Sequence, residues 1–304
     1  RILGKGIGVP PEGVHDILDR HVSGHYMAKA ALEMGCWGIA SRLRATSLAK
    51  MLGGERAKVA TGISIGIQRD PDAIAARAVA AHKQGYRKIK IKIQPGADVE
   101  FIRAVRQALP QGTDVSADAN SAYVFGDAAH LALLDEFNLI MIEQPLHRDD
   151  LVRHAALQRQ IKTPICLDES ITDMQRTEDM VALGSGKIVN IKPGRVGGLA
   201  MSKRIHDFCQ RNGVPVWCGG MLESGIGRAY NVALASLPNF LLPGDLSPSS
   251  RYWEKDIVEP EWTMDDEGMV AVPREVLGIG VQVDRDRVEN ITVRREDLRA
   301  PGQG

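Results

Sequence analysis

Five charged residues close five consecutive β-rich runs, and together they could carry out acid–base chemistry on a bound carboxylate. They are Lys92 in KIKIKI, Asp118 in SADAN, Glu143 in MIEQP, Asp168 in CLDES and Lys192 in NIKPG. Side chains at the carboxyl ends of consecutive parallel strands meet at one mouth of a barrel. Their nearly equal spacing therefore predicts a single site made of three carboxylates and two amines.

The three carboxylates predict a metal ion. Asp118, Glu143 and Asp168 would repel one another at close range and need a compensating cation to stay ionised near neutral pH. A set of oxygen donors without His or Cys favours a hard ion, so we expect Mg2+, with Mn2+ as a substitute, rather than zinc. The alternative is that these acids only cap helices or pair with lysines, which explains any one of them better than all three in register.

The two lysines predict proton transfer. A substrate held on the metal would lie between Lys92 and Lys192. An amine near Mg2+ and a second ammonium has a lowered pKa, so one lysine could act as base while the other acts as acid. Mg2+ on the substrate carboxylate would stabilise the enediolate that forms when the α-proton leaves. A Schiff-base lysine is the competing use of such a residue.

The run RKIKIKI, residues 87 to 93, alternates lysine with isoleucine. In a barrel strand the Ile side would face the helices and the Lys side the barrel axis. We expect Lys92 and Lys90 at the mouth, whereas Lys88 either bends to solvent at the opposite rim or pairs internally. An exposed edge strand with a solvated lysine face is the alternative.

These residues need a scaffold, and eight β-rich runs between residues 59 and 245 alternate with helical stretches. The runs are KVATGISIGI, RKIKIKI, DVSAD, LIMIE, TPICLD, KIVNIK, VPVWCGG and FLLPGD. Intervening segments such as PDAIAARAVAAHKQG have helical periodicity and end in Gly. This order predicts a parallel (β/α)8-type barrel. A doubly wound open sheet is the rival, weakened by the lack of GxGxxG after the first strand.

Composition excludes several function classes. Lys plus Arg (38) balances Asp plus Glu (38), so no overall charge attracts nucleic acid or an anionic membrane. No apolar run is long enough to span a bilayer. The four cysteines show no CxxC spacing and suit a reducing compartment, so we expect a cytoplasmic protein.

Two glycine-rich stretches, PGRVGGL and CGGMLESGIG, follow late strands. Such loops could hold a phosphate through backbone N–H groups, or could be tight turns where backbones approach closely. Arg195 stands three residues after Lys192 and could bind a second carboxylate of the substrate. A helix-surface position is the alternative for this arginine.

The motifs KIKIK, DANSAY, IEQPL, LDES and NIKPGRVGG, followed by CGGMLESGIGR and SSRYWEKDI, resemble the enolase superfamily. The closest resemblance is to its branch of o-succinylbenzoate synthases and N-succinylamino acid (N-acylamino acid) racemases, and it extends from about Gly24 to Asp284. It implies a TIM-type (β/α)7β barrel over residues 59–245. It also implies a partial N-terminal α+β capping domain over 1–58, recognisable by its helical part, and a C-terminal segment over 246–304 that returns to the cap.

The resemblance also implies roles for individual residues. Asp118, Glu143 and Asp168 would bind Mg2+, Lys92 and Lys192 would be the acid/base pair, Lys90 would assist the developing carboxylate charge, and Asn120, Glu169, Arg195 and Met221 would contact the substrate. The implied function is a Mg2+-dependent racemase of N-succinyl or N-acyl amino acids. The alternative is o-succinylbenzoate synthase, a dehydratase of menaquinone synthesis, and one site could do both. A lidless metal-binding relic is the alternative outside enzymology. We expect a small carboxylate as substrate, no nucleic-acid or membrane partner, and a homo-oligomer.

Overall fold

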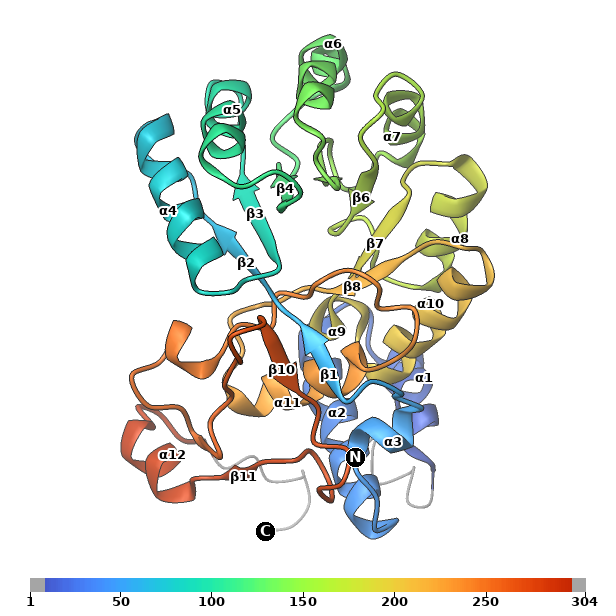
Figure 1. Cartoon of the computed structure of the whole chain (residues 1–304). Coiled ribbons are helices and arrows are strands. Elements are labelled where there is room, and N and C mark those ends of the chain that lie inside the picture. The colour runs from blue at the N-terminus through green and yellow to red at the C-terminus, as the bar shows by residue number, and fades with distance from the viewer. Residues whose placement is uncertain (1–8, 297–304) are drawn as a thin grey trace.

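A curled parallel sheet forms the centre of the molecule, whose computed structural model describes residues 9–296 (Figure 1). Its strands follow one another in chain order, and each neighbouring pair is parallel. The strands are β2 (Gly62–Ile65), β3 (Lys88–Lys92), β4 (Asp114–Asp118), β5 (Ile142–Glu143), β6 (Ile165–Leu167), β7 (Ile188–Ile191) and β8 (Val216–Cys218). The predicted α/β fold of the TIM-barrel type is confirmed.

An irregular stretch, and not an eighth strand, closes the barrel. The predicted run FLLPGD passes between β8 and β2 as extended chain, with single bridges from Phe240 to Val216 and from Gly244 to Thr61. Pro243 lies between the two bridges and has no N–H to donate to a ladder, which keeps this stretch from forming a regular strand. The eighth position of the barrel is therefore filled by backbone with a bend in it.

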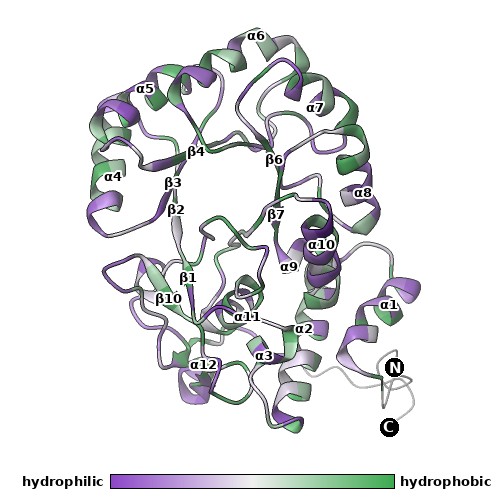
Figure 2. Cartoon of the chain, turned by 45° about the vertical axis from the view of Figure 1, so that its right-hand side comes forward, coloured by the Kyte–Doolittle hydropathy of each residue, from purple (hydrophilic) through white to green (hydrophobic). Residues whose placement is uncertain are grey.

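Helices cover the outside of the sheet, and Figure 2 shows them ringing the strands. They are α4 (Pro71–Lys83), α5 (Val99–Ala108), α6 (Ala128–Leu131), α7 (Leu151–Gln158), α8 (Met174–Leu183) and α10 (Leu199–Arg211). Local sequence sets their ends: the Asp70 side chain accepts from the N–H of Ala73 at the start of α4, and α8 ends at Gly184 with φ of 69°. None of the helices within residues 9–296 is long and apolar enough to cross a membrane.

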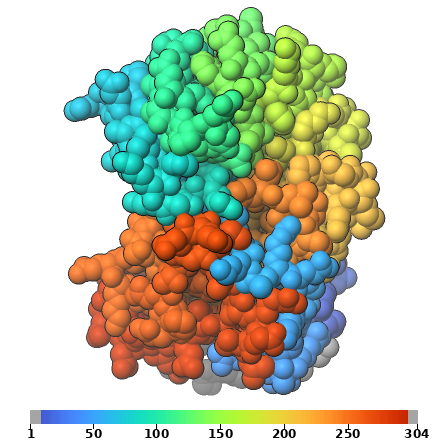
Figure 3. All heavy atoms as spheres, viewed as in Figure 1, coloured from blue at the N-terminus to red at the C-terminus, as the bar shows by residue number. Residues whose placement is uncertain are grey.

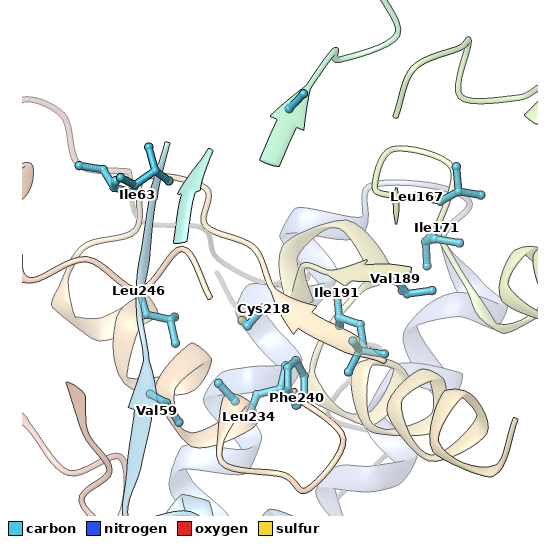
Figure 4. Close-up of a cluster of buried hydrophobic side chains, with 14 of the residues drawn as sticks. Val59, Ile63, Leu167, Ile171, Val189, Ile191, Cys218, Leu234, Phe240 and Leu246 are labelled. Atoms are coloured by element: carbon cyan, nitrogen blue, oxygen red, sulfur yellow. The ribbon is translucent and has the colours of Figure 1, made fainter. Parts of the chain in front are cut away.

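Apolar side chains fill the space between sheet and helices. Ile89 and Ile91 of β3 are fully buried in the main apolar cluster, as the alternation of RKIKIKI predicts. Figure 4 shows part of the same cluster, with Val189 and Ile191 of β7 among the labelled side chains. Burial of this kind stabilises the fold by about 25 cal/mol for each Å² of apolar surface removed from water.

The N-terminal helices pack against the last third of the barrel. Helices α1 (Pro11–His21), α2 (Tyr26–Leu43) and α3 (Leu48–Leu52) lie beside α9 (Pro193–Val196), α10 and α11 (Gly225–Ala235). The Glu33 carboxylate of α2 reaches the start of α10, where it accepts from the N–H groups of Leu199 and Ala200, each at 2.8 Å. Backbone donors at a helix start are natural partners for a carboxylate.

A glycine pair makes this close approach possible. Gly197 and Gly198 have φ of 88° and 128°, and a Cβ on Gly198 would collide with the Glu33 side chain. Glycine is needed there for both its conformation and its size. In PGRVGGL the glycines therefore serve a close backbone approach, which favours the tight-turn interpretation over a phosphate loop.

The chain after the barrel returns to residues 47–60. Strand β1 (Lys58–Ala60) pairs with β10 (Met269–Ala271), and β9 (Val258–Glu259) pairs with β11 (Gln282–Val283) ahead of α12 (Arg285–Ile291). Figure 3 shows the blue residues near position 50 against the orange-red C-terminal residues. The run KVATGISIGI, predicted as one strand, thus divides at Thr61 between two sheets. The domain boundaries at 58/59 and 245/246 stay predictions.

Candidate active site

The predicted strand-end residues come together at one end of the sheet. Lys92 of β3 stands opposite Asp118 of β4, and Asp118 stands opposite Glu143 of β5. Asp168 follows β6 and Lys192 follows β7 directly. The acids are almost completely buried, so their charges interact with little screening by water.

One group of contacts surrounds Lys92, and we call it the Lys92 side. The Lys92 Nζ donates to Asp118 Oδ2 at 2.5 Å and to the side-chain oxygen of Asn120. Asn120 in turn donates from Nδ2 to Glu169 Oε1 at 2.8 Å. The Lys92 side chain is 29% exposed. The structure thus links the predicted base to two predicted substrate contacts.

A second group surrounds Lys192, and we call it the Lys192 side. The Lys192 Nζ donates to Asp168 Oδ2 at 2.7 Å, and Arg195 donates to Asp168 Oδ1. Lys192 is 12% exposed and Arg195 is 17% exposed. Arg195 lies in the short helix α9, where its backbone N–H donates to the Lys192 carbonyl, and this turn brings it close to Lys192. The Arg195 guanidinium therefore pairs with Asp168. Its contact with a second carboxylate of the substrate stays a prediction.

Lys90 lies below the mouth, between two of the acids. Its Nζ is 3.1 Å from Glu143 Oε2 and 3.4 Å from Asp118 Oδ2. Asn190 of β7 donates to the other Glu143 oxygen at 2.8 Å. Glu143 Oε2 is buried, yet no donor within residues 9–296 has hydrogen-bond geometry to it. A buried carboxylate oxygen without a donor is costly unless a cation approaches it.

Burial and neighbouring charges shift the acids in different directions. Burial raises the pKa of Asp168 to about 7, although Lys192 opposes this. Burial and the charge of Glu143 also raise the pKa of Asp118. Burial alone would raise the pKa of Glu143 as well, but Lys90 and Lys192 outweigh it and hold that pKa well below its usual range. The pKa values of the three acids thus depart from their ordinary values in opposite directions, as burial and nearby charges dictate.

From the sequence we expect a lowered pKa for one of the two lysines. For Lys192 the shift has the opposite sign. Burial lowers this pKa, but the charges of Asp168 and Glu143 outweigh burial, so the pKa of Lys192 is raised. The expectation assumed a cation as the nearest charge, whereas the nearest charges here are carboxylates. In this arrangement Lys192 is held as an ammonium.

The donor set fits a hard divalent cation. Asp118, Glu143 and Asp168 offer only oxygen ligands, and Glu143 Oε2 is free to accept one more partner. In the part of the chain that the structure describes, no three acid, His or Cys side chains enclose a metal-sized space. Lysine and arginine nitrogens contact these acids instead. An ion would therefore bind by replacing those nitrogens at the acid oxygens.

Two cavities adjoin these side chains. One of about 690 Å³ is lined by Glu169, Arg195 and Met221 together with Tyr26 and Met27 of α2. The other, of about 360 Å³, opens over Lys92 and Asn120. Three of the four predicted substrate contacts thus share the larger cavity, and the fourth lines the smaller one. Their contacts with a substrate stay predictions.

Sequence reasoning missed several polar residues of this site. Gln144 accepts from the N–H groups of Asp168 and Ser170 and so ties the end of β5 to the chain after β6. Asp245 accepts from Lys90 at 2.8 Å. It closes the run FLLPGD as other acids close their runs, and that signal was available. Lys88 is fully buried and lies 3.8 Å from Asp245, so it pairs internally and the solvent alternative is wrong.

Comparison with known proteins identifies relatives of this chain. Residues 73–287 match the family model "Enolase C-terminal domain-like". An o-succinylbenzoate synthase of Geobacillus kaustophilus is 53% identical over 266 residues, which cover 88% of this chain and 70% of the relative. An N-succinylamino acid racemase of Thermus thermophilus is 46% identical over 294 residues, 96% of this chain and 78% of the relative. The crystal structure of an enolase-superfamily member from Listeria innocua superposes with a TM-score of 0.88 at 41% identity, covering 92% of this chain and 74% of the other.

Proposed function

This chain belongs to the enolase superfamily, and on that premise we propose that it is a Mg2+-dependent racemase of N-acylated amino acids, with N-succinyl derivatives as the favoured substrates. The reaction is a proton exchange at the carbon next to the substrate carboxylate. One lysine removes the proton from one face, and the other lysine delivers a proton to the opposite face.

One observation carries this proposal: two amines flank the row of acids, each bonded to a different one. Lys92 Nζ is bonded to Asp118, and Lys192 Nζ is bonded to Asp168. A dehydratase needs only one such group, whereas inversion at carbon needs a donor and an acceptor on opposite faces. The racemase name of a relative at 46% identity adds support.

The residues would divide the work as follows. When bound by Asp118, Glu143 and Asp168, Mg2+ would supply positive charge that makes the proton next to the substrate carboxylate more acidic. Of the two lysines, Lys92 beside Asp118 and Lys192 beside Asp168, one would accept the proton from the substrate and the other would donate one. The roles exchange for the opposite enantiomer.

Lys90 and the larger cavity would support this exchange. The Lys90 ammonium, between Glu143 and Asp118, adds a fixed positive charge close to the reacting carboxylate. The cavity lined by Glu169, Arg195 and Met221 would receive the acyl group or the side chain.

The second candidate is o-succinylbenzoate synthase activity. The Geobacillus kaustophilus synthase is 53% identical to this chain, more than the Thermus thermophilus racemase at 46%. The synthase reaction would begin with the same removal of an α-proton and end with departure of a neighbouring hydroxyl as water. Both activities are compatible with one set of side chains.

Proton exchange in D2O tests the proposal. The protein with Mg2+ and N-succinyl-L-phenylglycine should exchange the α-proton, followed by NMR, and lose optical rotation at the same rate. Exchange with retained rotation would contradict the two-lysine racemase and favour the synthase, whose cyclohexadiene substrate should then be dehydrated. Binding without any exchange would contradict both and support the non-enzymatic alternative.

A further inference from the structure

Asp245 stands at a point where its carboxylate has a fixed direction. Its N–H donates to the Cys218 carbonyl at 2.9 Å, and its own carbonyl accepts from Arg228 at 2.7 Å. The preceding Gly244 bridges to Thr61, so this backbone is held from the β8 side and from the β2 side. The carboxylate consequently points toward β3, where Lys90 Nζ lies 2.8 Å from its Oδ2.

Two buried lysines of β3 share this single carboxylate. Lys90 Nζ donates to Asp245 Oδ2 at 2.8 Å, and Lys88 Nζ lies 3.8 Å from Asp245 Oδ1. The ring of Trp217 covers both amines, with its centroid 3.4 Å from Lys88 Nζ and 4.7 Å from Lys90 Nζ. Both lysines are buried, and among the residues described Asp245 is the one carboxylate that lies within 4 Å of both amines.

The Lys90 amine lies within 4 Å of three carboxylates, and it donates a hydrogen bond to one of them. Of the carboxylates within 4 Å, only Asp245 receives a hydrogen bond, while Glu143 and Asp118 stay at 3.1 Å and 3.4 Å. Glu143 Oε2 faces the same amine, yet it has no hydrogen-bond partner among the residues described. The amine thus directs its hydrogen bond to Asp245, while it stays within ion-pair distance of the two other acids.

We propose that Asp245 is a positioning residue that accepts the hydrogen bond of the Lys90 ammonium, which would otherwise go to Glu143 or Asp118, and so keeps the oxygens of those two acids available to a divalent cation. This rests on the proposed function, in which those two acids bind Mg2+. Without Asp245, the same ammonium would direct its hydrogen bond to Glu143 Oε2, which lies 3.1 Å away and has no hydrogen bond among the residues described. It would then compete with the metal for that oxygen.

Metal affinity tests this assignment without recourse to activity. Free Mn2+, measured by its electron paramagnetic resonance signal, should titrate the wild-type protein and the variants Asp245→Asn and Lys90→Met. Losing the charge-assisted bond between Asp245 and Lys90 should raise the Mn2+ dissociation constant about tenfold or more. Lys90→Met should bind Mn2+ at least as tightly as wild type, because the competing amine is gone.

The double variant separates positioning from simple loss of negative charge. With Lys90→Met already present, Asp245→Asn should change the dissociation constant less than about threefold. A full loss in that background would overturn the proposal, because Asp245 would then act on the metal directly by its charge. Unchanged affinity in the single variant Asp245→Asn would overturn it as well.

A matched control guards against a general effect of losing a buried acid. Asp256 is also buried, but it accepts from the Gly225 N–H at 2.9 Å and the Ser249 hydroxyl at 2.6 Å, and no lysine within residues 9–296 forms an ion pair with it. Asp256→Asn should leave Mn2+ affinity within about twofold, and a loss as large as that of Asp245→Asn would overturn the assignment. Wild-type protein that binds no Mn2+ would instead refute the metal site of the proposed function, a result distinct from any difference between variants.

Discussion

The two sides of the mouth each carry a lysine bonded to an acid, but the two lysines are held very differently. On the Lys192 side, Arg195 and the short helix α9 lie over Asp168, and the N-terminal helices press against the turn that follows. On the Lys92 side, the lysine is more exposed and rests against Asn120, beside a cavity of about 360 Å³. Lys192 is therefore held in place by its surroundings, whereas Lys92 has room to move when a ligand binds.

The residues that hold the Lys192 side in place, which we call the brace, are Glu33 and His15 of the N-terminal helices, far from Lys192 in the sequence. Glu33 of α2 accepts from the Leu199 and Ala200 N–H groups and also from the Trp37 indole. His15 of α1 is 3.1 Å from the Gly197 carbonyl through its Nδ1. The difference between the sides teaches that the N-terminal helices support the chain around Lys192, whereas Lys92 has no such support among the residues described.

Removing either lysine should have the largest effect. Lys192→Ala and Lys92→Ala should each lower racemisation about a thousandfold or more, the range for loss of a general acid or base. Each variant should still exchange the α-proton of one enantiomer in D2O, by the lysine that remains. NMR of the separate D and L substrates measures this, and full racemisation by Lys192→Ala would rule out the two-base scheme.

Two glycines test the difference in bracing. Gly198 follows β7 and Gly96 follows β3, with φ of 128° and 84°, but only at Gly198 would a Cβ meet a side chain, that of Glu33. Gly198→Ala should destabilise the protein by about 4 kcal/mol, from backbone strain plus the clash. Gly96→Ala should cost about 1–2 kcal/mol, from strain alone. Urea unfolding measures both, and equal losses would show that the Lys192 side is no more tightly packed.

The buried carboxylate of the brace should respond to pH. Burial raises the pKa of Glu33 to about 7, from an ordinary value of 4.5. A folded state that holds this proton more tightly than the unfolded state is stabilised by it fully below pH 4.5, and loses that stabilisation as pH rises through 7. Relative to wild type, Glu33→Gln should thus gain up to about 3 kcal/mol between pH 4.5 and 7.5.

Unfolding curves in urea at several pH values between 4 and 8 measure this difference. The glutamine loses hydrogen bonds to Leu199 or Ala200 at every pH, so only the slope against pH carries the result. Parallel stability curves for Glu33→Gln and wild type would contradict the prediction.

The smallest effect is expected on the adjustable side. Asn120→Ala removes hydrogen bonds to Lys92 and Glu169, and a net bond contributes about 1 kcal/mol. Exchange on the Lys92 face should slow by about twofold to tenfold, and exchange on the Lys192 face should stay unchanged. Equal slowing of both enantiomers in the NMR assay would show that Asn120 does not act through Lys92.

The strand-end residues could be predicted because a barrel repeats one strand and one helix at a nearly constant length. Each chemistry-bearing residue then falls at the same place in its repeat. The eighth repeat departs from this regularity, because Pro243 interrupts the run FLLPGD and no regular strand forms there. Asp245, which closes that run, was not predicted as a site residue. Contacts such as that of Glu33 with Leu199 join residues far apart in the sequence, so they cannot be predicted from a local sequence pattern. Homo-oligomerisation and the roles of individual site residues stay predictions.

The division of one extended run between β1 and β2 also affects how the protein is made. Residues 62 to 65 pair with β3 a short way down the chain, whereas Lys58 to Ala60 must wait for Ala271 to Met269. At a synthesis rate of about 5–20 residues per second, that partner emerges about 10–40 seconds later. During this interval β1 has an unpaired edge, which can bind other chains. The barrel sheet can begin to assemble on the ribosome, while the sheet beside it is completed only after Ala271 has been synthesised.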